Sequence, residues 1–174
     1  MTDKIQDEWF PLVDETGKVI GKATRRQCHD GSMLLHPVVH LHVICNGRLY
    51  LQKRSIHKDI QPGKWDTAVG GHVDYGEEIE DALRREAREE LGITDFTPIH
   101  NFTYVFRSSV ERELVFSYRT EYDGSLSPDP GELETGDFWE LHDIVGNMEK
   151  GIFTPNFVHE FKLLLPLIQD RLIR

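Results

Sequence analysis

A glycine pair followed by an acidic stretch with helical spacing is the feature that most limits how this chain can fold. Gly70 and Gly71 predict a turn, because adjacent glycines disfavour regular structure. The residues after them predict a helix over 76–91, which Gly92 would end. Apolar residues recur there with the period of a helix and predict its buried stripe: Ile79, Leu83, Ala87 and Leu91.

Three glutamates, Glu86, Glu89 and Glu90, would lie on one side of this helix, at the border between its buried and exposed faces. Their like charges repel each other, which indicates that a cation lies beside them. Mg²⁺ and Mn²⁺ bind carboxylates, carbonyl oxygens, water and phosphate oxygens, so three carboxylates near a glycine turn suit either ion. The plain alternative is an acidic helix that faces only solvent.

With 174 residues, the chain is expected to form a single domain, 1–174, that buries a core without disulfides or metals as crosslinks. A metal site would therefore be functional. The two cysteines, Cys28 and Cys45, lack metal-binding spacing and suit a reduced intracellular protein in which both are structural. No apolar run is long enough for a signal core or a membrane span, so we expect a cytoplasmic protein with no membrane partner.

The net charge of −10 argues against a nucleic-acid partner, because binding to a phosphate backbone depends on clustered lysines and arginines. An anionic small molecule is a compatible partner if a metal and a local basic strip reverse the field where it binds. The stretch 53–64 offers such a strip, which includes Arg54 and Lys58. The alternative interpretation is an ordinary hairpin edge that carries lysines.

Segments with strand propensity surround the helix and predict a sheet. The stretches 9–13 and 19–24 predict a hairpin within an N-terminal extension over 1–30. Asn46-Gly47 predicts a tight turn between two central strands, 38–45 and 48–54. Further strands are expected at 65–69, 97–107, 113–122 and 137–141, and a final helix over 157–173, interrupted or kinked at Pro166. Strands with isolated helices predict a sheet with helices packed on its faces.

The charged residues of the acidic stretch stand at fixed offsets. Over 71–93 the sequence reads G-x5-E-x7-R-E-U-x-E-E-x-G-U, where U is an apolar residue, without a departure. The matching residues are Gly71, Glu77, Arg85, Glu86, Ala87, Glu89, Glu90, Gly92 and Ile93. This pattern resembles the Nudix box, and its length makes it far more specific than a short glycine motif.

The resemblance implies an α/β (α+β) fold, the Nudix α/β/α sandwich with a mixed central sheet, with a divalent metal held at a diphosphate linkage. In this family the residues matching Glu86, Glu89 and Glu90 hold Mg²⁺ or Mn²⁺, and the carbonyl matching Gly71 assists. Glu86 is then a candidate base, oriented by Arg85. The chemistry agrees, because the anionic oxygens of a diphosphate repel an attacking group until a metal neutralises them.

Residues outside the box resemble type 1 isopentenyl-diphosphate isomerase, itself a Nudix-fold enzyme. The matches are spread over most of the chain and include 14–15, Gly17, Gly21, 28–29, 34–36, 52–54, 62–63, Trp65, His72 and 111–113. The resemblance implies a second metal site, for Mn²⁺, Zn²⁺ or Mg²⁺, made of His29, His36, His72, Glu111 and Glu113. It also implies that Arg54 and Lys58 meet the diphosphate.

Two departures separate this chain from that isomerase. Gly70 stands where the isomerase has a catalytic cysteine, and Asn156 stands near the place of a tryptophan that steadies a carbocation. Isomerases also tend to carry a degraded box, whereas this one is complete. We therefore expect an enzyme that hydrolyses phosphorus-containing acid anhydrides. It would be a metal-dependent pyrophosphohydrolase for a small organic diphosphate, such as a nucleoside diphosphate derivative, with Glu113 as the best catalytic carboxylate outside the box, acting as a metal ligand or a base.

Two other hypotheses are left open. One is isomerisation of isopentenyl diphosphate through Glu113 and the histidine site. The other is a nucleotide-sensing module without catalysis, whose expected mark is a damaged box. A homodimer is the commonest assembly for such a domain. The box handles phosphates, so it does not identify the group attached to them.

Overall fold

The computed structural model describes residues 7–58, 60–131 and 133–172. In this part of the chain, one sheet contains β3 (Leu35–Cys45), β4 (Arg48–Arg54), β5 (Trp65–Thr67), β6 (Val69–His72), β7 (Ile99–Arg107), β8 (Arg112–Glu121) and β9 (Leu133–Trp139). The order is β5-β4-β3-β8-β7, with β6 also paired to β3 and β9 to β4. β3 and β8 are parallel, whereas the other pairs are antiparallel. The sheet is therefore mixed, as expected.

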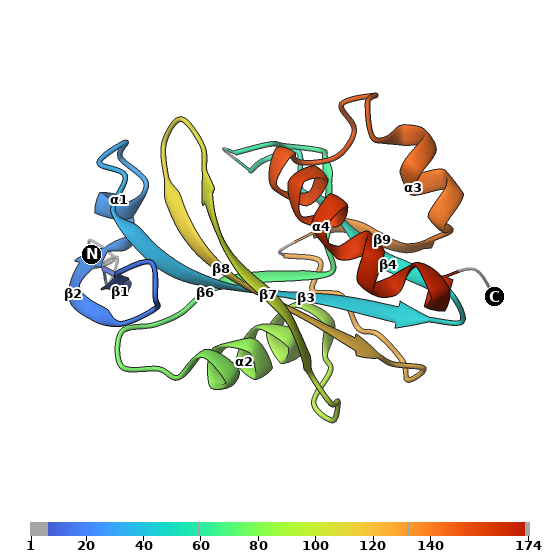
Figure 1. Ribbon diagram of the computed structural model, residues 1–174, viewed down its shortest axis with the longest axis horizontal. Helices are drawn as coiled ribbons and strands as arrows, with labels where there is room; N and C mark the ends of the chain where they lie inside the picture. The colour runs from blue at the N-terminus through green and yellow to red at the C-terminus, as the bar shows by residue number, and fades with distance from the viewer. Residues whose placement is uncertain (1–6, 59, 132, 173–174) are drawn as a thin grey trace.

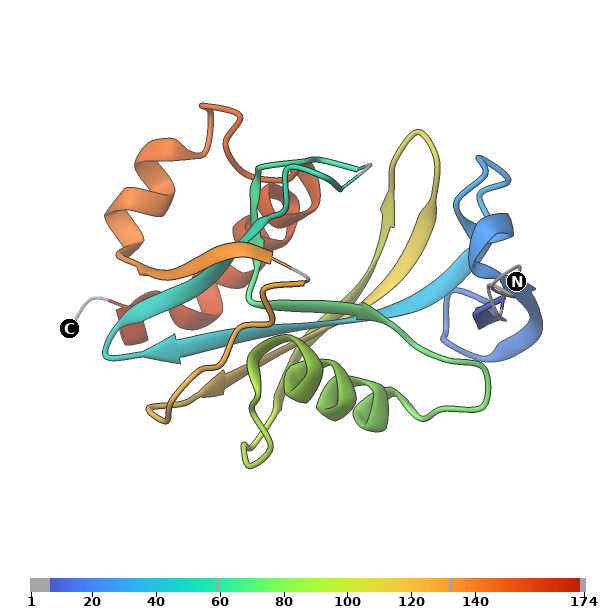
Figure 2. The ribbon, with the colours of Figure 1, turned by 180° about the vertical axis from the view of Figure 1, so that it is seen from behind.

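Helices cover both faces of this sheet, which gives three layers (Figures 1 and 2). They are α1 (Arg25–Cys28), α2 (Ile79–Leu91), α3 (Leu141–Asn147) and α4 (Pro155–Leu172). α2 lies on one face, and α3 and α4 lie on the other. One apolar cluster joins α2 to β3 through Leu83 and Leu41, and a second joins α4 to the opposite face through Phe157 and Ile44. β3 contributes to both because its alternate side chains point to opposite faces.

The glycine pair lies in a strand, so the turn predicted at Gly70-Gly71 is wrong. β6 pairs with β3, and Gly70 lies opposite His40 while Gly71 lies opposite Val39. Successive residues of a strand face opposite sides, so Gly70 faces the α4 side of the sheet and Gly71 faces the α2 side. Glycine within a strand often marks a close approach of another group, and Gly71 is of this kind, whereas a Cβ atom at Gly70 would be in ordinary contact with His40.

The acidic helix starts at Ile79, later than the predicted residue 76. Gly76 has a φ of +90°, and the Glu77 amide donates to the Asp74 carbonyl, so a turn precedes the helix. The end of the helix agrees with the prediction, because Gly92 adopts the left-handed conformation at its C-terminus.

Other element boundaries also differ from the predicted ones. β9 starts at Leu133 rather than 137, and two short helices, α1 and α3, were not predicted. α4 starts at Pro155 and continues through Pro166, so the helix is not interrupted there. Its predicted last residue, 173, lies outside the described residues. None of the helices in the described ranges is both long and apolar enough to cross a membrane.

The N-terminal hairpin has the predicted strands, β1 (Trp9–Val13) and β2 (Val19–Thr24); residues 1–6 of the predicted extension lie outside the described residues. Together with α1 it lies at one end of the sheet (Figure 1). The Tyr75 amide donates to the Trp9 carbonyl at 2.8 Å, which ties the hairpin to the loop before α2. Phe10 stacks on the His72 ring with 4.4 Å between ring centroids. The hairpin therefore covers the end of β6 that follows the glycine pair.

Candidate active site and metal centre

The Glu86 carboxyl group lies directly against the backbone of Gly71. A Cβ atom at Gly71 would stand 2.0 Å from Glu86 Cδ and 2.4 Å from Glu86 Oε1, which are impossible distances. Only glycine can occupy this position while Glu86 keeps its place. Burial raises the pKa of Glu86, although the Arg85 guanidinium opposes this shift.

Arg85 joins the loop before α2 to the helix. Its Nε and Nη2 each donate to Glu77 at 2.9 Å, and Nη2 also donates to the His72 carbonyl at 3.0 Å. Its Nη1 donates to Glu86 at 2.7 Å and to Glu89 at 3.4 Å. Although burial acts in the opposite direction, the hydrogen bonds from Arg85 hold the pKa of Glu77 below its ordinary value. Two-pronged contacts of this kind are the strong ones among charged hydrogen bonds.

Glu90 is buried at the junction of α2, β4 and β6. Its Oε2 accepts from the Gln52 amide at 3.1 Å and from the Gly70 backbone amide at 3.4 Å. Glu89 is more open to solvent, with its side chain 52% exposed. The three box glutamates therefore sit along one edge of α2, with Glu86 and Glu89 both bonded to Arg85.

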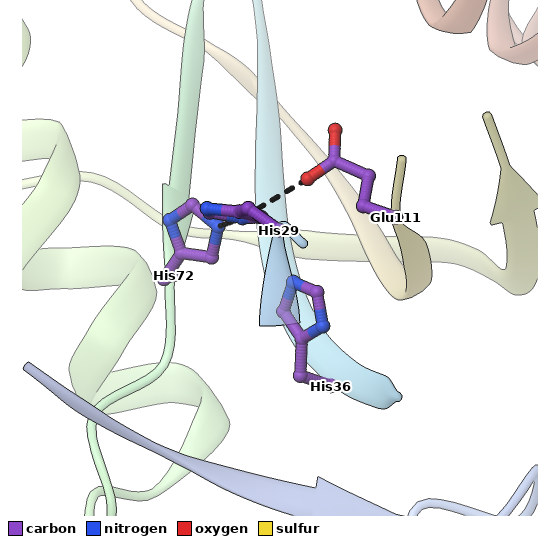
Figure 3. Close-up of side chains that lie close together, drawn as sticks. All are labelled: His29, His36, His72 and Glu111. Atoms are coloured by element: carbon purple, nitrogen blue, oxygen red, sulfur yellow. Dashed lines mark hydrogen bonds and ion pairs between the residues drawn. The ribbon is translucent and has the colours of Figure 1, made fainter. Parts of the chain in front are cut away.

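A second set of ligand atoms gathers on the other side of the sheet (Figure 3). It comprises His29 after α1, His36 in β3, His72 in β6 and Glu111 just before β8, with one ligand atom from each within 4.8 Å of the others. His29 Nε2 lies 3.2 Å from His72 Nε2 and 3.0 Å from Glu111 Oε2. Ligands of one tetrahedral ion stand about 3.4 Å apart at ordinary metal–nitrogen lengths, so these separations fit a single ion.

The protonation of these histidines also fits a metal. His36 Nδ1 lies 3.0 Å from the Leu34 carbonyl, whereas its Nε2 is buried without a hydrogen-bond partner. An imidazole that donates from one nitrogen presents the other as a lone pair, the form that binds metals. Burial lowers the pKa of His36 and of His72, which keeps both rings neutral. Among the described residues, this is the one group with ligand atoms so close together.

Glu113, the fifth residue implied for that site, does not join this group. Its carboxyl group is buried, and burial together with the nearby Glu111 charge raises its pKa to about 8. At neutral pH it is therefore mainly protonated and can donate a hydrogen bond. His36 and Glu113 are nonetheless register partners in β3 and β8, so the two side chains share one face of the sheet.

The two residues implied for the diphosphate lie at the end of β4 and in the turn after it. Arg54 Nε donates to the Ile60 carbonyl at 3.0 Å, and Nη1 lies 3.4 Å from Asp66 Oδ2. Lys58 lies in the turn that follows, where its amide donates to the Ser55 carbonyl. Charges on Arg54 and Asp66 both act on Glu113, so Arg54 borders the same region as that carboxyl group.

A buried network that sequence reasoning did not find lies between β3 and α4. His40 Nδ1 is 2.5 Å from Glu160 Oε2, His42 Nε2 is 2.9 Å from Glu160 Oε1, and Glu160 is completely buried. The Tyr104 hydroxyl lies 3.1 Å from Glu160 and 2.7 Å from Asn156 Oδ1. A signal was available, since Glu160 interrupts the apolar stripe of α4 and both histidines point to one side of β3.

This network predicts a stability that falls at alkaline pH. Burial alone would lower the pKa of His40, but the charge and hydrogen bond of Glu160 raise it from 6.5 to about 9. Below pH 6.5 the unfolded histidine is protonated too, so the stabilisation is complete there and is lost as the pH rises through 9. We expect the free energy of unfolding to fall on the order of 2 kcal/mol over this window, measured by urea denaturation.

The control for this prediction is the double variant His40→Gln with Glu160→Gln, which replaces the ion pair by two neutral amides. Its unfolding free energy should change much less over the same pH window. An equal pH dependence in the two proteins would contradict the role given to His40.

Comparison with known proteins agrees with the fold and the box. The family model described as NUDIX domain matches residues 35–161. This match covers the central sheet, α2, α3 and the first part of α4. The chain belongs to the Nudix family.

Relatives carry two kinds of name. An isopentenyl-diphosphate Delta-isomerase of Brevibacterium linens is 30% identical over 175 residues, which cover 95% of this chain and 96% of the relative. A Yersinia pestis protein named as an uncharacterized Nudix hydrolase is 29% identical over 159 residues, covering 91% of this chain and 86% of the relative. The resemblance to both Nudix branches seen in the sequence is confirmed.

Solved structures share the fold of this chain. The crystal structure of DR0079 from Deinococcus radiodurans has a TM-score of 0.75 and 24% identity, covering 96% of this chain and all of that one. The Nudix domain of Shewanella oneidensis NrtR, crystallised with ADP ribose, has a TM-score of 0.61 and 16% identity, covering 81% of this chain and 89% of that one. Both show the architecture expected from the sequence.

Neither cysteine of this Nudix protein lies beside Gly70. Cys28 is buried in α1 against Phe10, and burial, with the charges of Asp30 and Glu111, raises its pKa to about 11. Cys45 is at the far end of β3. With a pKa of about 11, the Cys28 thiol is unreactive at neutral pH. Asn156 lies at the start of α4, where it accepts from Tyr104.

Proposed function

We propose that this Nudix protein is a divalent-metal-dependent pyrophosphohydrolase that cleaves the diphosphate bond of a small organic molecule, such as a nucleoside diphosphate derivative. The observation that carries the proposal is the contact of Glu86 with Gly71. In this contact the carboxyl group of a helix residue lies against the backbone of a β6 glycine, within a box that has every charged residue of the Nudix pattern. A binding module that had lost catalysis would have no need to keep this arrangement.

The residues that would hold the metal are Glu86, Glu89 and Glu90, with the carbonyl of Gly71. They fit a hard cation, because all the donors are oxygens and the missing side chain at Gly71 leaves the carboxyl group of Glu86 against the backbone. A bound Mg²⁺ or Mn²⁺ would neutralise phosphoryl oxygens and lower the pKa of a water molecule. Glu86 is positioned to take a proton, since Arg85 holds one of its oxygens and leaves the other available.

Other residues would bind and orient the substrate. Arg54 ends β4 and Lys58 lies in the turn that follows it, and we assign both residues to the far phosphate. Glu113 is protonated near neutral pH and would donate a hydrogen bond to the substrate, whereas only its ionised form would act as a base. ADP ribose, the ligand in the NrtR domain, illustrates the class of molecule that we expect.

Isomerisation of isopentenyl diphosphate is the second candidate. The Brevibacterium linens relative carries that name, and the histidine cluster is the observation that favours it. Against it, Gly70 supplies no proton-transferring group and the two thiols are elsewhere. A protein with one carboxyl group but no thiol at this position lacks one of two partners for proton transfer across an alkene.

The test is a panel of diphosphates that includes nucleoside diphosphates, ADP ribose, nucleotide sugars and isopentenyl diphosphate. The expected result is release of phosphate or a nucleoside monophosphate from at least one nucleotide, lost in EDTA and restored by excess Mg²⁺. Conversion of isopentenyl diphosphate to its allylic isomer without phosphate release would replace hydrolysis by isomerisation. Tight binding with no turnover of any compound would support the sensing module instead.

The histidine cluster gives a prediction that does not depend on catalysis. We infer that His29, His36, His72 and Glu111 bind one Zn²⁺ or Mn²⁺ ion. Added metal should raise the thermal midpoint of unfolding, by an amount equivalent to about 2.7 kcal/mol at a hundredfold excess over the dissociation constant. His36→Gln should remove most of this shift.

His142→Gln is the matched control, because the His142 side chain is 80% exposed and lies outside the cluster. Its metal-induced shift should equal that of the wild type. An equal shift in the His36 variant would contradict the assignment.

A further inference from the structure

His40 and His42 bind the same buried carboxylate, yet the surroundings of their second ring nitrogens differ. Each histidine uses one nitrogen on Glu160: Nδ1 in His40 and Nε2 in His42. A carboxylate that is ionised only accepts hydrogen bonds, so each of these two nitrogens carries a proton. The remaining nitrogen of each ring is what distinguishes the pair.

The second nitrogen of His42 is enclosed. His42 is completely buried, and its Nδ1 has no hydrogen-bond partner among the described residues. No ligand can reach this atom without displacing the core around it. His42 is therefore confined to a structural role.

The second nitrogen of His40 faces Gly70. A Cβ atom placed on Gly70 would lie 3.5 Å from His40 Nε2 and 3.4 Å from Cδ2. His40 is 8% exposed, and its Nε2, unlike His42 Nδ1, is not among the described side-chain atoms that are enclosed without a hydrogen-bond partner. The opposite edge of the ring is against the fully buried Glu160, so the exposed edge is the one that carries Nε2. The side chain that Gly70 lacks leaves space in front of a hydrogen-bond donor.

The space borders the region already assigned to the substrate. His40 and Arg54 both act electrostatically on Glu113, so the three groups lie close together on the α4 side of the sheet. Glu160 keeps His40 positively charged at neutral pH. His40 is paired with Glu160 and Arg54 with Asp66, so the attraction for an anion comes from the N–H donors that these partners leave open, Nε2 of His40 among them.

We propose that His40 Nε2 binds an anionic phosphate oxygen of the substrate, which enters over Gly70, and that Glu160 is the residue that positions the ring for this contact. The proposal rests on the proposed function only for the identity of the anion. The ligand class is a phosphate or diphosphate ester, and the contact is a hydrogen bond between charged partners. Nothing in this role requires the box metal or the histidine cluster to be loaded.

The test uses methylenediphosphonate, a diphosphate analogue that cannot be hydrolysed, with binding measured by calorimetry in Mg²⁺ at neutral pH. His40→Gln should weaken binding about tenfold to a hundredfold, the usual loss for one hydrogen bond to a charged group. His42→Gln is the matched control, because it also removes one bond to Glu160, and it should bind like the wild type. Equal weakening in the two variants would overturn the proposal, and so would a wild type that does not bind the probe.

A second variant guards against misfolding of His40→Gln. Gly70→Ala leaves the Glu160 network untouched and adds a methyl group in ordinary van der Waals contact with the ring, so it should fold. The methyl group would occupy the space in front of Nε2 and should also weaken probe binding about tenfold. Unchanged binding in Gly70→Ala would overturn the proposal. These binding measurements do not need turnover, so they remain decisive even if no substrate is hydrolysed.

The role of Glu160 has its own readout. The charged and titratable groups that face His40 come from several elements: Glu160 on α4, Asp66 on β5, His72 on β6, Glu113 on β8 and, through Glu160, Tyr104 on β7 and His42 on β3. In the wild type, probe binding should persist up to about pH 9. In Glu160→Gln it should be lost at a lower pH, because the ring loses its charged partner. A pH profile that does not move would show that Glu160 does not act through His40.

Discussion

Gly71→Ala is expected to lower kcat for diphosphate hydrolysis about a hundredfold or more while the fold survives. The new Cβ would overlap Cδ, Cγ and Oε1 of Glu86, all of which belong to the end of a flexible side chain. The carboxyl group can therefore rotate away instead of forcing β6 out of the sheet. That movement takes the Glu86 carboxyl group away from the Gly71 backbone and from Arg85, and so breaks up the arrangement that we propose for the metal site. Steady-state kinetics with Mg²⁺ measure the loss.

Two controls define what a loss in Gly71→Ala means. Glu86→Gln should reduce kcat to a similar extent, because both changes remove the same carboxylate from the site. Gly70→Ala places its methyl group on the opposite side of the same strand, so Mn²⁺ binding at the box should be unchanged there and weakened in Gly71→Ala. Urea denaturation should give unfolding free energies within about 1 kcal/mol of the wild type for both alanine variants. Full activity in Gly71→Ala would show that the contact with Glu86 is not needed.

Arg85→Lys is expected to destabilise the protein by about 2 kcal/mol and to lower kcat about a hundredfold. Lysine keeps the positive charge but cannot donate to both oxygens of Glu77, to Glu86 and to the His72 carbonyl at once. The loop that ends β6 would then lose its link to α2, and Glu86 would lose its orientation. Urea denaturation measures the first effect and steady-state kinetics the second.

Arg88→Lys provides the matched comparison, since Arg88 is on the same helix but exposed. It should leave both the stability and the rate close to those of the wild type. If Arg85→Lys behaved like Arg88→Lys, the charge of Arg85 alone would be sufficient and its hydrogen-bonding geometry would not matter.

Much of the fold was predictable, because local patterns and tertiary structure agree. The N-terminal hairpin, the Asn46-Gly47 turn and the stripe of α2 follow from periodicity and turn chemistry. The glycine pair was not predictable in this way. Its two residues have the propensity of a turn, and the pairing with β3 overrides that propensity for reasons that lie far away in the sequence.

The candidate site likewise has a part that local sequence patterns predicted and a part that they did not. The box glutamates stand within one helix, so their spacing predicted their common side. The second cluster was predicted only through the resemblance to the isomerase, since no local pattern links α1, β3, β6 and the start of β8. Its members are His29, His36, His72 and Glu111. His40 and Glu160 were missed because their contact joins residues 120 positions apart. A charged residue in an apolar helical stripe, such as Glu160, indicates that a buried polar partner exists, but the sequence does not identify that partner.

The histidine cluster draws its ligands from separate parts of the chain, and this has a mechanical consequence. His29 belongs to the N-terminal segment that contains the hairpin and α1, whereas His36 and His72 belong to the sheet. An ion shared by the three would fasten that segment to the sheet as a removable crosslink, comparable to a disulfide that closes a loop. Chelation would then loosen the whole segment together with Phe10, which covers His72. Digestion by a protease near residues 9–29 would report the occupancy of the ion.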